Sequence, residues 1–457
     1  MGKRCLVIGI DGLPKTLLEQ LAAQEVMPFC ARLLRQGTLV SLRAPVPEVS
    51  STSWATFLTG VNPARHGIYG FIDLKPFSYQ FFFPNLKHLE SPVLWDFATR
   101  AGLKTLCLNV PTTYPARPLN GVLISGFPAP DYRKCFFPSE LAEELSALGY
   151  VLDVEVGDVA SDPQGFLLRI EQSLDARLRA FTYLLEREDW DLGIAVLTET
   201  DRLQHFLWNA LAEPSHPLHA RVLDIYRRVD QCVAAIAAGI KESDALFLVS
   251  DHGFAGIKAQ VYLNAWLRRG GYLSLSPDAE NFACIDAETK AFALDPGRIY
   301  IHRAGRFPKG AVSESEAEDL RRKLRLELSA LRWDAQTGEL SANGQGEPIL
   351  QDIFLKEEIY TGALLQSAAD LIAVPATGFN LRGAWKHSAI VGSDSMTGAH
   401  TRGNAVFYYR GALSTQAEAE MQDVAPTMLA TLGIDYSVEF DGHNLTAPAD
   451  VETVTLT

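Results

Sequence analysis

The stretch Cys5-Leu6-Val7-Ile8-Gly9-Ile10, followed directly by Asp11, predicts the first strand of a buried sheet. An apolar run without alternation is typical of a strand covered on both faces. Two more runs have this form, at 190–197 and 245–250, and each comes shortly before an aspartate, Asp201 and Asp251. Open α/β sheets place their sites beyond the carboxyl ends of the strands. The three aspartates are therefore expected at one edge of one sheet.

Helical patterns alternate with these strands, which indicates an α/β fold with a mainly parallel central sheet flanked by helices. We predict helices at 17–37 (closed by Gly37), 164–186, 219–240, 313–331 and 422–432, and further strands at 102–109, 121–126 and 404–409. The pattern loosens after Gly253. We expect residues 260–390 to form an inserted cap over the sheet edge, with 1–259 and 391–457 forming the catalytic core.

The composition narrows the class of protein. The chain has 457 residues, 47% of them apolar, which is typical of a globular protein with a large core. A net charge of −14 without a basic stripe argues against binding to nucleic acid. Six scattered cysteines without a CxxC spacing favour a reduced, cytoplasmic protein. The first apolar run is too short for a signal peptide, and no stretch approaches the ~20 apolar residues of a membrane span.

Seven residues from separate parts of the chain form a candidate metal-ligand set. They are three aspartates, three histidines and one hydroxyl: Asp11, Ser50, Asp201, His205, Asp251, His252 and His400. Mixed nitrogen and oxygen donors suit two divalent ions, most simply Zn²⁺, with Mn²⁺ as the alternative. Two ions that clamp a phosphate beside a serine would indicate hydrolysis of a phosphate ester.

Each motif also has a structural interpretation. Asp201 and His205 are four residues apart and would share one face of a helix, although such pairs are common without a ligand. Asp251 and His252 are adjacent, so they can share a ligand role only if the chain bends, which Gly253 permits. A plain strand-ending turn is about as plausible. His400 follows Gly398, which suggests a loop with close backbone approach. His66 is expected to be structural.

Ser50 precedes a short apolar helix at 54–58 that ends at Gly60. The default role of such a serine is an N-cap. The functional role uses the same position, because free N–H groups at a helix start bind phosphate. Ser51, Thr52 and Ser53 are rival hydroxyls, so chemistry alone leaves the nucleophile open.

The motifs together resemble a known family. Ile8-Gly9-Ile10-Asp11-Gly12, the block Ser50 to Ile68, Thr200-Asp201-Arg202-Leu203-Gln204-His205, Ser250-Asp251-His252-Gly253 and Gly398-Ala399-His400 occur in this order. This is similar to the type I phosphodiesterase/nucleotide pyrophosphatase family of the alkaline phosphatase superfamily. The resemblance spans nearly the whole chain and implies an alkaline-phosphatase-like fold.

The resemblance also implies roles for individual residues. The family's nucleophile lies nine residues before the threonine of a Thr-Gly pair, which is Ser50 counted from Thr59. By the same carry-over, Asp11, Ser50, Asp251 and His252 would hold one ion, and Asp201, His205 and His400 the other. Two positions depart from the nucleotide-cleaving members, which usually have threonine at the nucleophile and asparagine three residues later. Here these are Ser50 and Ser53.

We therefore expect a two-metal phosphoesterase that hydrolyses a small-molecule phosphate mono- or diester through a phosphoserine intermediate. Ser51 and Ser53 are expected to contact the phosphate, through the backbone N–H groups after Ser50 and the Ser53 hydroxyl. The alternatives are a phosphoryl transferase or mutase on the same metal core, a nucleotide pyrophosphatase, and a binding protein that kept the fold without catalysis. A sulfatase is disfavoured, because Thr52 and Trp54 stand where its motif requires proline and arginine.

Overall fold

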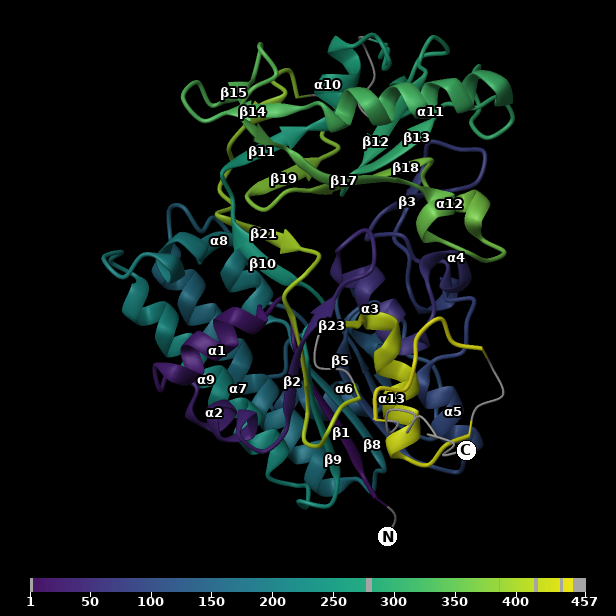
Figure 1. Cartoon of the computed structure of the whole chain (residues 1–457). Coiled ribbons are helices and arrows are strands. Elements are labelled where there is room, and N and C mark those ends of the chain that lie inside the picture. The colour runs from purple at the N-terminus through teal and green to yellow at the C-terminus, as the bar shows by residue number, and fades with distance from the viewer. Residues whose placement is uncertain (1–2, 277–281, 386, 415–417, 436–438, 447–457) are drawn as a thin grey trace, which may run out of the picture.

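The computed structural model describes residues 3–276, 282–385, 387–414, 418–435 and 439–446. Some parts of the expected core and cap lie outside the described residues, at 1–2, 277–281, 386, 415–417, 436–438 and 447–457. The chain builds a large α/β core with a smaller, strand-rich layer above it (Figure 1).

A nine-stranded sheet forms the centre of the core, in the order β23-β2-β22-β9-β1-β8-β5-β6-β7. Its strands are β1 (Cys5–Ile10), β2 (Thr38–Arg43), β5 (Thr105–Val110), β6 (Gly121–Ser125), β7 (Phe136–Phe137), β8 (Leu192–Leu197), β9 (Ala245–Val249), β22 (Ala405–Tyr409) and β23 (Glu418–Glu420). The middle strands β9, β1, β8, β5 and β6 are parallel, and β22 and β7 run antiparallel to their neighbours. This confirms the predicted fold class.

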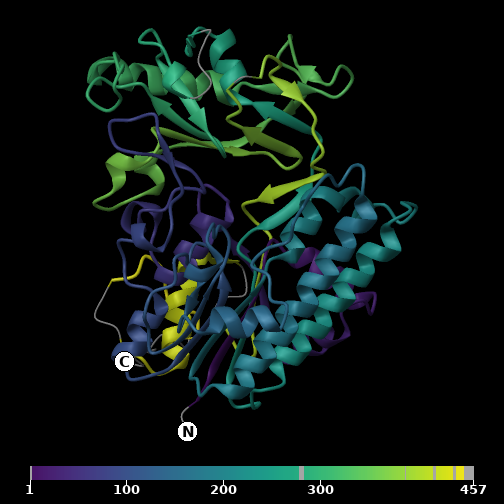
Figure 2. The same ribbon diagram turned by 180° about the vertical axis from the view of Figure 1, so that it is seen from behind.

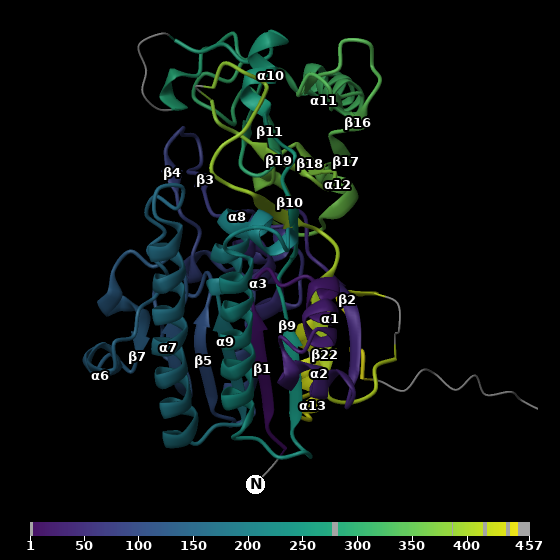
Figure 3. The same cartoon turned by 90° about the vertical axis from the view of Figure 1, so that its left-hand side faces the viewer.

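Helices cover both faces of this sheet, as Figures 1 and 3 show. The helices of the core are α1 (Lys15–Ala23), α2 (Pro28–Leu34), α3 (Ser50–Thr59), α4 (Pro63–His66), α5 (Leu94–Arg100), α6 (Leu141–Ala147), α7 (Pro163–Arg187), α8 (Glu199–Ala212), α9 (His219–Ala237) and α13 (Val424–Thr431). Alternate residues of β1 point to opposite faces. Leu6 and Ile8 pack in the cluster with α7, α8 and α9, whereas Cys5 and Val7 pack in the cluster with α3, α5 and α13. Both faces of β1 are therefore buried, which explains its continuous apolar run.

The single helix predicted at 17–37 is wrong. The chain forms α1 and α2, separated by Glu25 with a positive φ of 58°. Pro28 is the first residue of α2, a position where its missing N–H costs no hydrogen bond. Gly37 is not a C-cap, because α2 ends at Leu34 and Gly37 directly precedes β2.

The upper layer lies over the carboxyl edge of the sheet and consists of separate small sheets (Figure 2). Its strands are β11 (Ala259–Tyr262), β12 (Ala291–Leu294), β13 (Arg298–Ile301), β14 (Arg332–Asp334), β15 (Glu339–Leu340), β16 (Glu347–Pro348), β17 (Leu350–Leu355), β18 (Leu371–Pro375), β19 (Phe379–Arg382) and β20 (Val391–Gly392). Its helices are α10 (Leu263–Arg269), α11 (Glu314–Ser329) and α12 (Lys356–Ile359). These elements bury a further hydrophobic cluster, to which Val46, Ala64 and Tyr69 of the core also contribute.

Two antiparallel ribbons link this upper layer to the core. The strands β10 (Gly253–Gly256) and β21 (Gly398–Thr401) pair with each other between the two layers. The hairpin of β3 (Asp73–Leu74) and β4 (Phe81–Phe82) rises from the core, and between its strands the hydroxyl of Tyr79 lies 2.6 Å from Nε2 of His302. Within the described part of the chain, no helix has the length and apolar character needed to cross a membrane.

Candidate metal centre and active site

Three neighbouring parallel strands deliver the predicted aspartates to one edge of the sheet. Asp11 directly follows β1, Asp251 follows β9, and Asp201 lies in the first turn of α8 after β8. Because β1 pairs with β8 on one side and with β9 on the other, the three carboxylates converge from chain segments that are far apart in sequence. Asp11, Asp201 and Asp251 are all buried.

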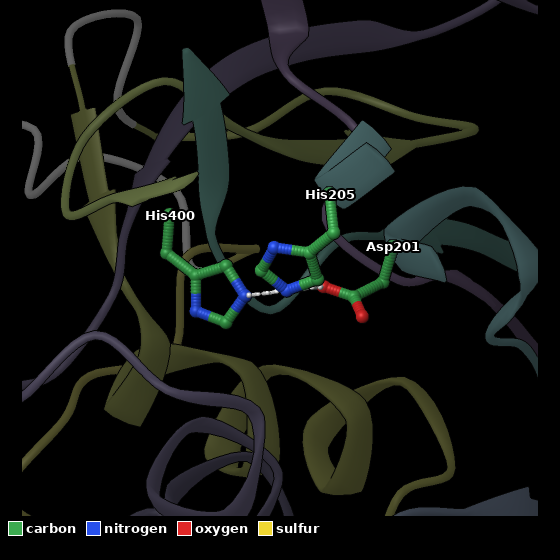
Figure 4. Close-up of side chains that lie close together, drawn as sticks. All are labelled: Asp201, His205 and His400. Atoms are coloured by element: carbon green, nitrogen blue, oxygen red, sulfur yellow. Dashed lines mark hydrogen bonds and ion pairs between the residues drawn. The ribbon is translucent and has the colours of Figure 1, made fainter. Parts of the chain in front are cut away.

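Asp201, His205 and His400 form one group of candidate ligands (Figure 4). Nε2 of His400 lies 3.1 Å from Oδ1 of Asp201 and 3.0 Å from Nε2 of His205. Nε2 of His205 lies 3.4 Å from the same aspartate oxygen. Asp201 and His205 come from one face of α8, as the four-residue spacing predicts, and His400 comes from β21. His400 therefore lies in a strand, and the expectation of a loop is wrong.

Asp11, Asp251 and His252 form a second group directly beside the first. Nε2 of His252 lies 3.2 Å from Oδ2 of Asp251 and 3.9 Å from Oδ1 of Asp11. The ring of His252 stacks on the ring of His400 with centroids 3.6 Å apart. The six side chains thus form one continuous cluster of two halves.

Gly253 is required next to this cluster for a reason other than the expected bend. A Cβ atom at Gly253 would lie 2.3 Å from the carbonyl oxygen of Gly403, so the close approach of the bend that follows β21 excludes a side chain. Gly398 has the close backbone approach that its sequence suggested, because a Cβ there would lie 2.4 Å from the carbonyl oxygen of Gln204.

The three histidines share one orientation. Nδ1 of His205 faces the carbonyl oxygen of Gly398 at 3.1 Å, Nδ1 of His252 faces that of Gly253 at 3.1 Å, and Nδ1 of His400 faces that of Glu48 at 3.0 Å. A carbonyl oxygen only accepts hydrogen bonds, so Nδ1 carries the proton in each neutral ring and Nε2 presents a lone pair to the cluster. Backbone carbonyls that fix histidines in this way are typical of metal sites.

The electrostatics of the cluster are unfavourable for the protein alone. Burial, and then repulsion by Asp251 and Asp201, raises the pKa of Asp11 well above its ordinary value. Burial raises the pKa of Asp251 to about 6, against a hydrogen bond from the Gly12 N–H that lowers it. Burial also lowers the pKa of His252 well below its ordinary value. Although burial opposes it, His205 and His400 hold the pKa of Asp201 well below its usual range.

Divalent cations fit this donor set. Oδ2 of Asp251 is buried without a hydrogen-bond partner, and the Nε2 atoms of His205 and His400 face each other at 3.0 Å. A cation placed between these atoms would satisfy the lone pairs and offset the carboxylate charge. Three carboxylates with three imidazoles suit zinc, and manganese accepts the same donors.

Ser50 opens α3 beside the second group. Its Oγ lies 3.1 Å from Nε2 of His252 and 3.5 Å from Oδ1 of Asp11. The default interpretation as an N-cap is wrong, because Val49 occupies the N-cap position and no side chain caps the helix. The first helical hydrogen bond runs from the N–H of Ser53 to the carbonyl of Val49, so the preceding N–H groups lie ahead of the helical ladder.

The rival hydroxyls of Ser51, Thr52 and Ser53 are buried and have no hydrogen-bond partner. Ser53 is three residues after Ser50 and therefore lies near it on the same face of α3. Trp54 follows on this face, and its indole N–H donates a hydrogen bond of 3.0 Å to Oδ2 of Asp11.

Two neighbours of the ligands were not predicted from the sequence. Trp54 fixes Asp11 as described above. Nη1 of Arg202 donates to Oδ2 of Asp201 at 3.2 Å, and Nη2 of the same guanidinium donates to Asp153 at 2.7 Å. Both residues lie inside motifs that the sequence displays, but neither local spacing nor composition indicates that Trp54 reaches Asp11 or that Asp153 pairs with Arg202.

His66 has the structural environment that we expected. Its Nδ1 accepts a hydrogen bond from the N–H of Ile68 at 3.1 Å, and its Nε2 lies 3.1 Å from the hydroxyl of Thr56. Burial lowers the pKa of His66 to about 3, so the ring is neutral.

Comparison with known proteins agrees with this geometry. Residues 5–402 match the family model described as type I phosphodiesterase/nucleotide pyrophosphatase. The chain belongs to this family. It is therefore a metal-dependent hydrolase of phosphate esters. A search of curated proteins finds no match.

Solved structures share the fold of this family member. The mouse ectonucleotide pyrophosphatase/phosphodiesterase 5 has a TM-score of 0.56 and 14% identity, covering 96% of this chain and 97% of its own. The human counterpart has a TM-score of 0.56 and 15% identity, with the same coverage of 96% and 97%. Phosphonoacetate hydrolase from Sinorhizobium meliloti, in complex with phosphonoacetate, has a TM-score of 0.61 and 14% identity, covering 95% and 96%. An inactive mouse variant was solved in complex with AMP.

Proposed function

We propose that this protein hydrolyses a small phosphate mono- or diester through a phosphoserine intermediate on Ser50. The observation that carries the proposal is the position of the Ser50 hydroxyl. It lies at the N-terminus of α3 and within 3.1 to 3.5 Å of ligand atoms of Asp11 and His252. Ser50 with Asp11, Asp251 and His252 would hold one ion, and Asp201, His205 and His400 would hold the second.

Two divalent ions in these sites would supply Lewis acidity, which lowers the pKa of a coordinated hydroxyl and neutralises charge on the phosphate oxygens. Oγ of Ser50 attacks phosphorus in line with the ester oxygen, so the P–O bond to serine forms as the bond to the alcohol breaks. The N–H groups of Ser51 and Thr52 and the dipole of α3 favour the negative charge of the phosphate. We propose that the Ser53 hydroxyl, which has no hydrogen-bond partner within the described residues, donates to a non-bridging oxygen. Water then hydrolyses the phosphoserine and restores Ser50.

The donor atoms support a proposal for the identity of the metal. We propose zinc as the first choice for both sites because three imidazoles are present, with manganese as the alternative. Metal analysis of the purified protein tests this, and full activity in metal-free protein would contradict it.

For the substrate, we propose monoesters or small diesters in preference to nucleotide pyrophosphates. Serine instead of threonine leaves more room beside phosphorus, and Ser53 replaces the asparagine donor of the nucleotide-cleaving members. The second candidate is a nucleotide phosphodiesterase, which the AMP complex of the mouse relative favours. The values of kcat/KM for a nitrophenyl monoester, a nitrophenyl nucleotide diester and ATP separate the two. A strong preference for the nucleotide diester or ATP would contradict our choice.

The nucleophile is tested by a matched pair of variants. Ser50→Ala should abolish turnover, whereas Ser51→Ala, one residue further along α3, should keep the nucleophile and retain turnover. Circular dichroism and the melting temperature check that both remain folded. Normal turnover by Ser50→Ala would place the nucleophile elsewhere. Product analysis with an added alcohol acceptor distinguishes hydrolysis from phosphoryl transfer.

Two further assignments remain proposals. We propose that 260–390 is one inserted cap, supported by its separate sheets and hydrophobic cluster. We also propose a cytoplasmic location, supported by six cysteines that are all buried. Fractionation of cells that express the full natural protein tests the location.

A further inference from the structure

A cavity of about 410 Å³ opens beside His205 and His400, between the core and the upper layer. A cavity of this size is typical of small-molecule sites. Apolar side chains from two parts of the molecule form its wall. One part is the core segment that leads into the β3–β4 hairpin, together with the hairpin itself, and the other is the upper layer. These side chains are Phe71, Ile72 and Phe81 from the core and Phe282, Leu294 and Trp385 from the upper layer.

An aromatic chain crosses from the core to the upper layer within this wall. The ring of Phe81 meets the ring of Phe282 edge-on, with centroids 4.9 Å apart, and the ring of Phe282 lies 5.6 Å from that of Trp385. Phe81 is 39% exposed and is one of the residues that line this cavity. Such a surface gains stability when an apolar group covers it.

The charges in the wall are few and predominantly acidic. Nε of Arg382 lies 3.7 Å from Oδ2 of Asp295, and its Nη1 donates to Sδ of Met396 at 3.5 Å. Glu48 is buried, and its Oε2 has no hydrogen-bond partner. Apart from the histidines of the metal cluster, the described wall residues therefore offer no uncommitted cation to a second anionic group. They offer instead one unpaired acceptor, which a hydroxyl of a ligand could satisfy.

We propose that this cavity receives the alcohol part of the substrate, and that this alcohol is bulky, largely apolar and free of a second anionic group. The inference rests on the proposed hydrolysis at Ser50 and adds the substrate class. The position beside His205 and His400 places the alcohol next to the reacting phosphate. The apolar wall disfavours a further phosphate or carboxylate, because burying an unpaired anion there costs free energy.

Matched esters test the inference. The alcohols are ethanol, 2-naphthylmethanol, 4-methylbenzyl alcohol and 4-carboxybenzyl alcohol, each presented as its phosphate monoester and as its methyl phosphodiester. Because a benzylic carbon separates the leaving oxygen from the ring, the methyl and carboxyl substituents change the leaving-group ability of the alcohol little. Comparison of the monoester series with the diester series shows whether a preference depends on the charge of the phosphate. We expect kcat/KM for the methylbenzyl ester to exceed that for the carboxybenzyl ester by at least about tenfold, and naphthylmethyl to exceed ethyl by a similar factor.

Equal kcat/KM across these alcohols, with turnover that depends on Ser50, would overturn the inference and leave the proposed function intact. Absence of turnover for every ester in both series, in metal-loaded protein, would contradict the proposed function itself and with it the inference.

A pair of phenylalanine variants localises the effect. Phe81→Ala should lower kcat/KM for the naphthylmethyl ester by roughly fivefold and leave the ethyl ester unchanged. Phe83 is 59% exposed and does not belong to the cavity wall, so Phe83→Ala should change neither value. If Phe81→Ala keeps the full preference for the naphthylmethyl ester, the alcohol binds elsewhere and the inference is wrong.

Discussion

Replacing Trp54 by phenylalanine should weaken metal binding without removing any ligand. The indole N–H of Trp54 donates 3.0 Å to Oδ2 of Asp11, and both residues are buried. A hydrogen bond to a charged group contributes about 1.5–3 kcal/mol. In metal affinity this corresponds to a loss of about 10- to 100-fold, the range typical of residues that orient a metal ligand.

The substitution of Trp54 also raises the pKa of Asp11, and this change weakens metal binding as well. The Trp54 hydrogen bond lowers this pKa, against the effects of burial and of the neighbouring carboxylates. Without it the pKa rises further, so a proton competes with the metal up to a higher pH. The loss of affinity should therefore be larger at pH 6 than at pH 8.

Trp95 provides the matched control. It is 1% exposed, and its indole nitrogen has no hydrogen-bond partner. Trp95→Phe therefore removes a similar buried volume and no hydrogen bond. Competition with a chelator should therefore give a clearly lower metal affinity for Trp54→Phe than for Trp95→Phe. Equal affinities for Trp54→Phe and the natural protein would refute the assigned role of the indole.

Further outcomes are expected for the metal cluster and for His66. The pKa of Asp251 is about 6, and Asp251 must lose its proton to bind a cation, so metal affinity should fall as the pH drops through about 6; calorimetric titration at several pH values checks this. Removal of metal by a chelator should lower the melting temperature, because three buried carboxylates then repel one another without compensation; an unchanged melting temperature would contradict metal binding at these sites. His66→Leu leaves the N–H of Ile68 without an acceptor and the hydroxyl oxygen of Thr56 without a donor, and should cost about 1–3 kcal/mol in the free energy of unfolding, with metal content unchanged.

Much of the fold was predictable because the strands that matter are buried on both faces. The run Cys5–Ile10 has no polar residue to interrupt it, and the aspartate after it marks the edge of the sheet. The predicted helix at 17–37 is wrong because proline cannot continue a helix without loss of a hydrogen bond, and Pro28 instead begins α2. Gly398 indicated a loop at His400, and the four residues of β21 are too short a run to show strand periodicity.

The candidate ligands were predictable as residue types, since aspartate and histidine are common ligands wherever they converge. Their supporting contacts were not. The bond from Trp54 to Asp11 joins residues 43 positions apart, and the pair of Arg202 with Asp153 spans 49 positions. Only the packing of α3 and α8 against the sheet brings these groups together. The apolar cavity could not be predicted from the sequence either, because its wall consists of residues far apart in the chain, such as Phe81 of the core and Phe282 of the upper layer.

The central claim is that phosphate is transferred to Ser50 before water releases it. Rapid quenching in acid during turnover of a nitrophenyl ester, followed by proteolysis and mass spectrometry, tests it directly. We predict one phosphoryl group on the peptide that contains Ser50, located on that residue by fragmentation and absent in Ser50→Ala. A phosphoryl group on Ser51 or Ser53, or turnover with no phosphorylated peptide at any quench time, would contradict the account.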